Sequence, residues 1–514
     1  MRTKNSLKNF GTGLVNTFVT TILSFVARTI FIKILGSSYL GVNGLLTNVL
    51  SMLSLVELGI GSAINFSLYK PIAEDDEEKV LLLMNFYKIA YRVIGAIVFG
   101  IGLILMCFIN VIIKDAGDVQ NVKLIFFIYL VNTTCSYFMT YKVTLLNAYQ
   151  KAYKINTINI IFSILTTVFQ CLILIITKNY IAYLLMNMVV LFVQRACVNR
   201  KITKMYPLLN KKVEGKLEKT ELQPILKNVK ALMFHKIGDY CINGTDNIII
   251  SSFISVGMVG IYSNYSMLIG IVNGVIVSFF NSMIASMGNL IAIESDKRKR
   301  QIFDLINFIG FWLFGFTAIC FYNLLNPFIE LWLGNNYVFS KGIVVVIILN
   351  YYLTGMRIPV YTVKSAAGLY NEDKFTPLIQ AGVNLFVSIV LVQSLGIVGV
   401  FLGTLISSLV LPCWQRPYIV CKYALKQSSK PYFQKYVKYI LVVMITALCL
   451  NLSLGVLFPN VTILNFAIST IICAIVPNVV FLGIFRKTDE FKELINIVNN
   501  ILGERLKWIK KLAL

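Results

Sequence analysis

The sequence predicts an all-α polytopic membrane protein with about 14 transmembrane helices. Hydrophobic residues make up 57% of the 514-residue chain and charged residues only 14%, and the mean hydropathy is +0.76. A helix needs roughly 20 consecutive apolar residues to cross a bilayer, and such runs recur from end to end. No soluble fold of this size needs so much apolar sequence.

The first apolar run, residues 10–35, follows a short basic start and has no small-residue cleavage site. We interpret it as a retained span and not as a cleaved signal peptide. Hydropathy places the later spans between polar or glycine-containing connections. The predicted spans are residues 10–35, 39–68, 82–113, 122–145, 156–177, 181–199, 231–254, 261–293, 303–326, 341–365, 376–394, 397–421, 438–458 and 462–485.

Basic residues concentrate in every second connection between these spans. The basic set includes the segments 195–230, 297–300 and 416–438, whereas the intervening connections hold few Lys or Arg residues. The positive-inside rule therefore places both termini in the cytoplasm. Because topology accounts for the formal net charge of +24, no nucleic-acid partner is expected.

The longest polar connection, residues 200–230, is predicted to be a basic cytoplasmic linker between two six-helix lobes. The N-lobe covers residues 1–199 and the C-lobe residues 231–421. The remaining segments are two C-terminal helices (438–485) and a basic amphipathic cytoplasmic tail (486–514). The tail either lies on the anionic inner leaflet or packs against the ends of the spans, and both interpretations stay open.

Two local matches indicate that the lobes are a pseudo-symmetric internal repeat, a frequent feature of transporters. Residues 35–42 match residues 254–261 at a separation of 219, and residues 148–151 match residues 369–372 at a separation of 221. Because each copy has an even number of spans, both copies run in the same direction through the membrane.

Arg28 lies well inside the first predicted span. A guanidinium at that depth costs roughly 2.5–3.5 kcal/mol on insertion scales, so such a residue is a functional candidate by default. Arg92, Arg357 and Lys364 are further candidates, because cationic side chains suit phosphate oxygens and Arg offers them a planar fork. The alternative is that long side chains near span ends extend to the headgroups, which we favour for Lys33, Lys88, Lys123 and Lys341.

Three acids also fall within predicted spans: Glu57, Asp239 and Asp246. A carboxylate in a membrane can pair with an Arg, take up a proton or bind Na⁺. Ion coupling and a purely internal salt bridge are therefore both open for these residues. The predicted span 231–254 is unusually polar, so we expect it to face a cavity.

Enzymatic and cofactor chemistry find little support in the sequence. The ten cysteines include no CxxC pair, the only histidine is His235, and there is no P-loop. A metal site with several histidine ligands is thus excluded, and neither a cofactor nor an ATPase activity is expected.

Residues 35–41 and 55–61 resemble the opening of the bacterial oligosaccharide-lipid flippases of the MOP exporter superfamily, which also contains MATE drug exporters and lipid II flippases. Further similarity lies in residues 245–250, 259–263 and 326–334, so the resemblance covers most of the chain.

This resemblance implies two lobes around a central cavity that opens alternately to each side of the membrane. It also implies a substrate of undecaprenyl-pyrophosphate carrying a sugar repeat unit, and Arg28 matches the cation in the first span that holds the pyrophosphate. Lipid II flippases carry further cations in spans two and eight. The predicted span 261–293 has none, so Arg92, Arg357 and Lys364 are the candidates for that role.

The expected function is a flippase for capsule or O-antigen-like polysaccharide in the bacterial cytoplasmic membrane. Its other expected partners are membrane lipids, Na⁺ or H⁺ if transport is coupled, and polysaccharide polymerase machinery. A cation-coupled multidrug exporter of the same fold is the first alternative. A membrane polysaccharide polymerase or ligase is less favoured, because the outer connections are too short for a large catalytic loop.

Overall fold

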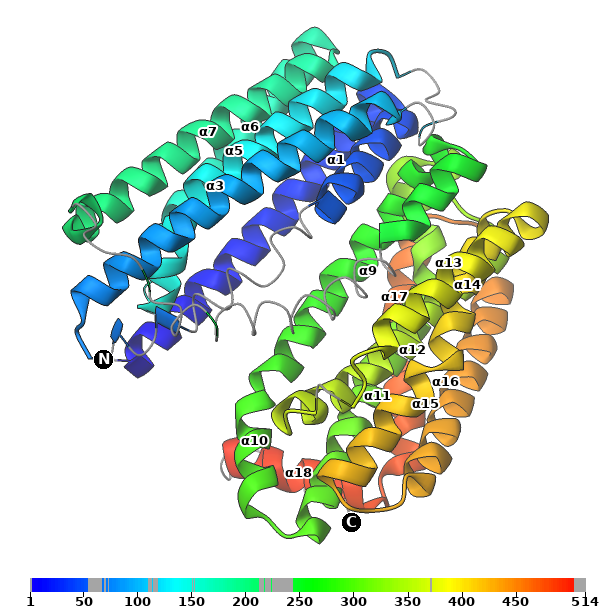
Figure 1. Ribbon diagram of the computed structural model, residues 1–514. Coiled ribbons are helices and arrows are strands. Elements are labelled where there is room, and N and C mark those ends of the chain that lie inside the picture. The colour runs from blue at the N-terminus through cyan, green and yellow to red at the C-terminus, as the bar shows by residue number, and fades with distance from the viewer. Residues whose placement is uncertain are drawn as a thin grey trace. The chain divides into compact units, whose positions relative to one another are not determined.

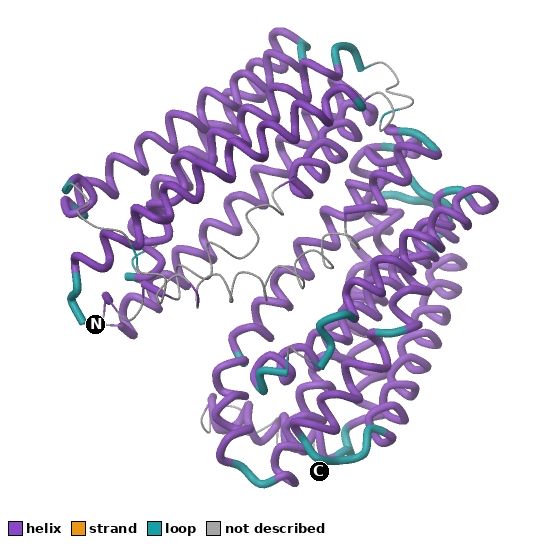
Figure 2. Tube along the Cα trace, viewed as in Figure 1, coloured by secondary structure: helices purple, strands orange, loops and turns teal. Residues whose placement is uncertain are grey.

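The computed structural model describes residues 2–53, 74–109, 119–149, 153–211, 244–369 and 372–502, with a few isolated positions between these ranges. Throughout these ranges the regular structure is helical (Figures 1 and 2). The chain divides into two compact units, residues 1–263 and residues 264–514. Each unit is described by itself.

The long helices of unit 1 are α1 (Arg2–Leu53), α3 (Glu77–Cys107), α5 (Val122–Ala148), α6 (Tyr153–Thr177) and α7 (Tyr180–Met205). The short η2 (Pro207–Asn210) follows α7, and unit 1 also holds the first residues of α9 (Val256–Ser282). Helix α3 packs on α5, and α6 packs on both α1 and α7 (Figure 1).

Helix α1 is broken at Gly36, whose φ of 82° and ψ of −175° are not helical. Glycine fits here because it lacks the Cβ that disfavours positive φ. The break falls in the predicted connection between the spans 10–35 and 39–68. The two halves of α1 therefore correspond to the first two predicted spans, as far as the second is described.

Unit 2 is built around α11 (Asp296–Leu333), which contacts α12 (Lys341–Ala366), α16 (Lys430–Leu457) and α17 (Ile463–Phe485). Phenylalanines of α11 form its core, with Phe303, Phe308, Phe311 and Phe314 fully buried. The other elements are α10 (Ile284–Ile293), η3 (Asn335–Tyr337), α13 (Thr376–Leu395), α14 (Ile397–Val410), α15 (Pro412–Ile419), η4 (Val420–Ala424) and α18 (Asp489–Leu502).

A ladder of polar contacts joins α13 to α14. Asn384 donates to Thr404 Oγ1 at 2.8 Å, Gln380 donates to Ser408 Oγ at 3.3 Å, and Ser388 donates to the Val400 carbonyl at 3.1 Å. Such bonds hold helices together in a medium where apolar contacts bring no net hydrophobic gain.

The tail helix α18 packs against the spans of unit 2. Phe491 is buried and stacks on Trp312 of α11, with ring centroids 6.0 Å apart. Glu490 pairs with Lys435 of α16, and Glu493 pairs with Arg298 at 2.8 Å. Of the two interpretations of the tail, packing against the ends of the spans holds for α18.

Among the described residues, 11 helices are long and apolar enough to cross a membrane. A twelfth is added if the bent pair Val122–Phe138 and Tyr141–Ala148 counts as one span. The all-helical polytopic fold class is confirmed. Helix α11 is longer than its predicted span 303–326, because Ser295 caps it and its charged first turns continue the helix beyond the apolar run. The predicted lobe, linker and tail boundaries, and the side on which the termini lie, stay predictions.

Candidate functional site

Arg28 of α1 reaches the first turns of α9 within unit 1. Its Nη1 donates to the carbonyl oxygen of Ser263 at 2.7 Å and lies 3.4 Å from Ser263 Oγ. The side chain is half-buried. Charged donors make stronger hydrogen bonds than neutral ones, so this contact ties the middle of α1 to α9.

Tyrosines surround this side of α1. Tyr183 of α7 lies within electrostatic range of Arg28. Tyr180, one turn earlier on α7, stacks on Tyr183 at 6.0 Å, and its hydroxyl lies 3.2 Å from that of Tyr129. Tyr129 in turn donates to Asn43 Oδ1 at 2.7 Å. Helices α1, α5 and α7 thus share one polar and aromatic cluster beside Arg28.

Asp246 also approaches α9. It lies in the helical residues 244–253, is 8% exposed, and is within electrostatic range of Tyr262. Tyr262 directly precedes Ser263, the partner of Arg28. Unit 1 therefore brings a buried acid and a half-buried base to consecutive residues of one helix. This is the arrangement expected of an internal charge balance or of an ion-coupled transporter.

The same region of α9 packs backbone against backbone on α1. A Cβ added to Gly41 would lie 1.9 Å from the carbonyl oxygen of Val256, and one added to Gly260 would lie 2.1 Å from that of Ser37. Only glycine permits so close an approach of two helices. This close packing fixes how α1 and α9 are aligned along their lengths, and therefore which residue of α9 Arg28 reaches.

The other predicted cations lie elsewhere. Arg92 is an exposed residue of α3, near Tyr141 of α5 in unit 1. Arg357 and Lys364 are buried residues of α12 in unit 2. Glu57 and Asp239 lie outside the described residues. The substrate-binding roles predicted for the three cations and the ion-coupling role considered for the two acids stay predictions.

Lys364 has an intramolecular partner that the sequence reasoning missed. Its ammonium pairs with Asp373, which is fully shielded from solvent, and Arg416 Nε lies 3.6 Å from the same carboxylate oxygen. Asp373 belongs to the connection between α12 and α13. A buried carboxylate between two cations anchors this connection to α12 and α15, which supports a structural role for Lys364.

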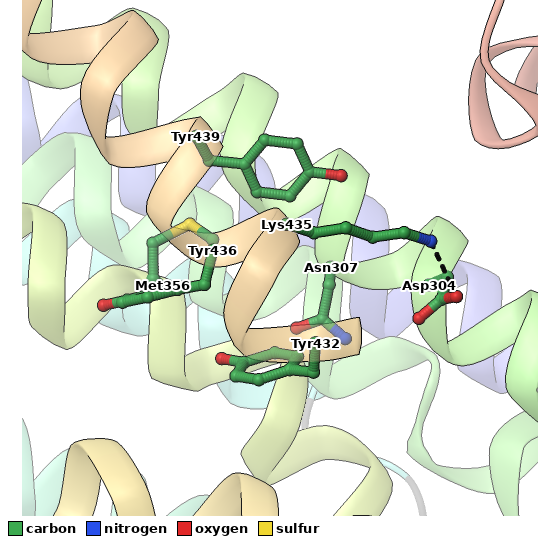
Figure 3. A pocket seen from close by; sticks show the side chains of 7 residues that line it. All are labelled: Asp304, Asn307, Met356, Tyr432, Lys435, Tyr436 and Tyr439. Atoms are coloured by element: carbon green, nitrogen blue, oxygen red, sulfur yellow. Dashed lines mark hydrogen bonds and ion pairs between the residues drawn. The ribbon is translucent and has the colours of Figure 1, made fainter. Parts of the chain in front are cut away.

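Arg357 lies two helical turns before Lys364 on α12. Its Nη2 donates to Thr354 Oγ1 at 2.9 Å, and Cys413 and Tyr436 lie within its electrostatic range. Next to it, a cavity of about 10 Å³ is lined by Met356 and by tyrosines of α16. Figure 3 shows these side chains, with Lys435 bonded to Asp304 at 2.9 Å. The cavity has room for about one water, so it is not a substrate site.

Within the part of the chain that the structure describes, no group of three or more His, Cys, Asp or Glu side chains is placed to hold a metal ion. The chemistry at hand is that of buried cations, a buried acid and tyrosines.

Comparison with solved structures identifies the fold. The lipid II flippase MurJ, in an inward closed conformation, superposes with a TM-score of 0.67 at 14% identity, over 94% of this chain and 99% of that one. An inward-facing multidrug resistance MATE transporter of the MOP superfamily gives 0.61 at 14% identity, over 79% and 95%. A mutant of the Vibrio cholerae MATE transporter VcmN gives 0.56 at 14% identity, over 82% and 99%.

No protein-family model and no curated protein matches the sequence. The structural likenesses give this chain the fold of the MOP-superfamily transporters, as the resemblance in the sequence predicted. They carry no information on its substrate.

Proposed function

We propose that this chain is a flippase that moves undecaprenyl-pyrophosphate-linked oligosaccharide units across the cytoplasmic membrane by alternating access, for surface polysaccharide synthesis. The observation that carries the proposal is Arg28, a guanidinium well inside the first predicted span and bonded to Ser263 of α9. Its planar fork suits the oxygens of a pyrophosphate. The substrate class follows the sequence resemblance to oligosaccharide-lipid flippases, and the chain shares its fold with a lipid II flippase.

The physical task is to shield a charged, sugar-bearing headgroup from hydrocarbon. A cation held at bilayer depth offsets the charge of the pyrophosphate where water cannot. An inside-negative membrane potential favours outward movement of this anion, by about 2.3 kcal/mol per charge per 100 mV. Export therefore needs no second energy source in principle.

The test uses the full-length protein in liposomes and a fluorescent undecaprenyl-pyrophosphate-linked oligosaccharide. A membrane-impermeant quencher added outside reports how much lipid reaches the outer leaflet. We expect transfer that depends on the protein and accelerates when the lumen is made negative. A well-folded protein that transfers none of this lipid would refute the proposal.

Cation-coupled drug export is the second candidate, because unit 1 holds the buried acid Asp246 beside Tyr262. A carboxylate in such a place can bind a proton or Na⁺. Efflux of a cationic dye driven by an imposed H⁺ or Na⁺ gradient, with no transfer of the lipid, would favour this function instead.

A further inference from the structure

Three cations of unit 1 gather between α3 and α5. Lys88 and Arg92 are one helical turn apart on α3 and therefore share a face. Lys142 of α5 lies within electrostatic range of Lys88, and Arg92 lies within range of Tyr141, the neighbour of Lys142. We call Lys88, Arg92 and Lys142 the α3–α5 cation cluster.

The register of the two antiparallel helices brings these cations to one level. Thr144 donates to the hydroxyl of Tyr87 at 3.1 Å, and further along α3 a Cβ on Gly102 would contact Leu130. Between these points the rings of Tyr91 and Tyr137 meet edge to face at 5.8 Å. These contacts along the α3–α5 interface thus fix where the three cations lie along the two helices.

The cluster combines anchored and accessible groups. Lys142 Nζ donates to Thr203 Oγ1 of α7 at 2.7 Å, which fixes its ammonium. Lys88 is half-buried and Arg92 is exposed. Among the residues that the structure describes, none of the three forms an ion pair with a carboxylate. Like charges held together at membrane level are costly, and an external anion would offset that cost.

The cluster extends inward from one end of unit 1. Helix α3 begins where α5 and α7 end, and the ion pair of Lys211 with Glu77 at 3.1 Å marks this end of unit 1. Lys142 is six residues before the end of α5, or about 9 Å at the rise of an α-helix, whereas Lys88 and Arg92 are 11 and 15 residues after the start of α3, or about 16 and 22 Å. This end carries the basic connections, so the positive-inside rule places it at the inner leaflet.

We propose that the α3–α5 cation cluster binds the phosphoryl headgroup of an inner-leaflet lipid. A phosphoryl group suits this set, because Arg92 offers its fork and the two lysines add positive charge. That the lipid is the lipid-linked pyrophosphate, captured here before it reaches Arg28, rests on the proposed function. The competing explanation is that the three side chains only extend to the membrane surface and bind no defined ligand.

The test measures binding of undecaprenyl pyrophosphate and, separately, of inorganic pyrophosphate to the full-length protein in phosphatidylcholine nanodiscs. Replacing all three cluster residues (Lys88→Gln, Arg92→Gln, Lys142→Gln) should weaken lipid binding at least about tenfold, because charge-assisted hydrogen bonds are lost. A matched control removes three exposed lysines of the same unit (Lys123→Gln, Lys178→Gln, Lys204→Gln) and should bind as the wild type does.

Two further variants distinguish a loss of binding from a failure to fold or insert. Lys88→Arg with Lys142→Arg keeps all charges and should keep binding. Arg92→Gln alone changes an exposed residue and should weaken binding severalfold even if the triple variant fails to insert.

The proposal fails if the cluster variants bind the lipid as tightly as the wild type, or if the control variant loses as much affinity. Inorganic pyrophosphate bound as tightly as the lipid would show a site for soluble anions and overturn the lipid assignment. Binding and transfer are measured separately. A protein that binds the lipid at the cluster yet never transfers its sugar-linked form would refute the proposed function and leave this site standing.

Discussion

Gly41 and Gly260 lie against each other in unit 1, at matching positions of the two copies of the internal repeat. A Cβ added to Gly260 would lie 3.1 Å from the nitrogen of Gly41. Each glycine meets the carbonyl group of the residue four positions before the other, Gly41 at Val256 and Gly260 at Ser37. Such an exchange is what a two-fold relation produces, and it supports the repeat inferred at a separation of 219 residues.

Replacing Gly260 with Ala should destabilise the protein by about 1–3 kcal/mol, because the added methyl overlaps the Ser37 carbonyl. Gly270 on the same helix has no neighbouring heavy atom within 4 Å of an added Cβ, so Gly270→Ala should be neutral or slightly stabilising. Thermal unfolding in detergent, followed by loss of the monodisperse peak, measures both. Equal stability of the two variants would contradict the close contact.

Arg28→Ala should reduce transfer of the lipid-linked oligosaccharide at least about tenfold, since charged hydrogen bonds contribute about 1.5–3 kcal/mol. Arg28→Lys should recover only part of the rate, because a point charge lacks the bidentate fork. Lys33→Gln removes an exposed cation from the same helix and is the matched control. Normal transfer by a well-folded Arg28→Ala protein would rule out the role assigned to Arg28.

The positions of the helices could be predicted because apolar runs and turn residues are local signals. The predicted span 376–394 and α13 (Thr376–Leu395) agree almost to the residue. The partner of Lys364 could not be predicted in this way. Asp373 lies in a short polar connection, where an acid normally faces solvent, and only the packing of α12, α13 and α15 buries it. Pairing across distant segments leaves no periodic trace in a sequence.

Asp373→Asn should destabilise unit 2 by about 3–5 kcal/mol, because it leaves the buried Lys364 without its counter-charge. The neighbouring Glu372 is exposed, so Glu372→Gln removes the same charge without breaking a buried pair and serves as the control. Thermal unfolding measures the stability of both variants, and only Asp373→Asn should unfold at a lower temperature than the wild type. A stable Asp373→Asn protein that has lost transfer would instead assign Asp373 to transport.

Docking of α18 should weaken in acid. Burial raises the pKa of Glu490, but the hydrogen bond and charge of Lys435, together with hydrogen bonds from the Glu490 backbone and Thr488, outweigh it, so the pKa of Glu490 lies below its usual value. A lowered pKa in the folded state gives stability that is complete above the unfolded pKa and is lost as the pH falls below about 4. Proteolysis after α17, measured against pH, should therefore increase in that range. Glu490→Gln should be cleaved at neutral pH, whereas the exposed control Asp489→Asn should not.

Replacing Asp246 tests whether unit 1 couples transport to an ion or only balances its own charge. Asp246 is 8% exposed and lies near Tyr262. Tyr262 directly precedes Ser263, the partner of Arg28. We expect the structural role, because a base held at bilayer depth is costly without a nearby acid. Asp246→Asn should then lower thermal stability, and transfer should be insensitive to imposed Na⁺ and H⁺ gradients in both proteins. A wild type that responds to a gradient, with a stable Asp246→Asn variant that does not, would instead make Asp246 the coupling residue.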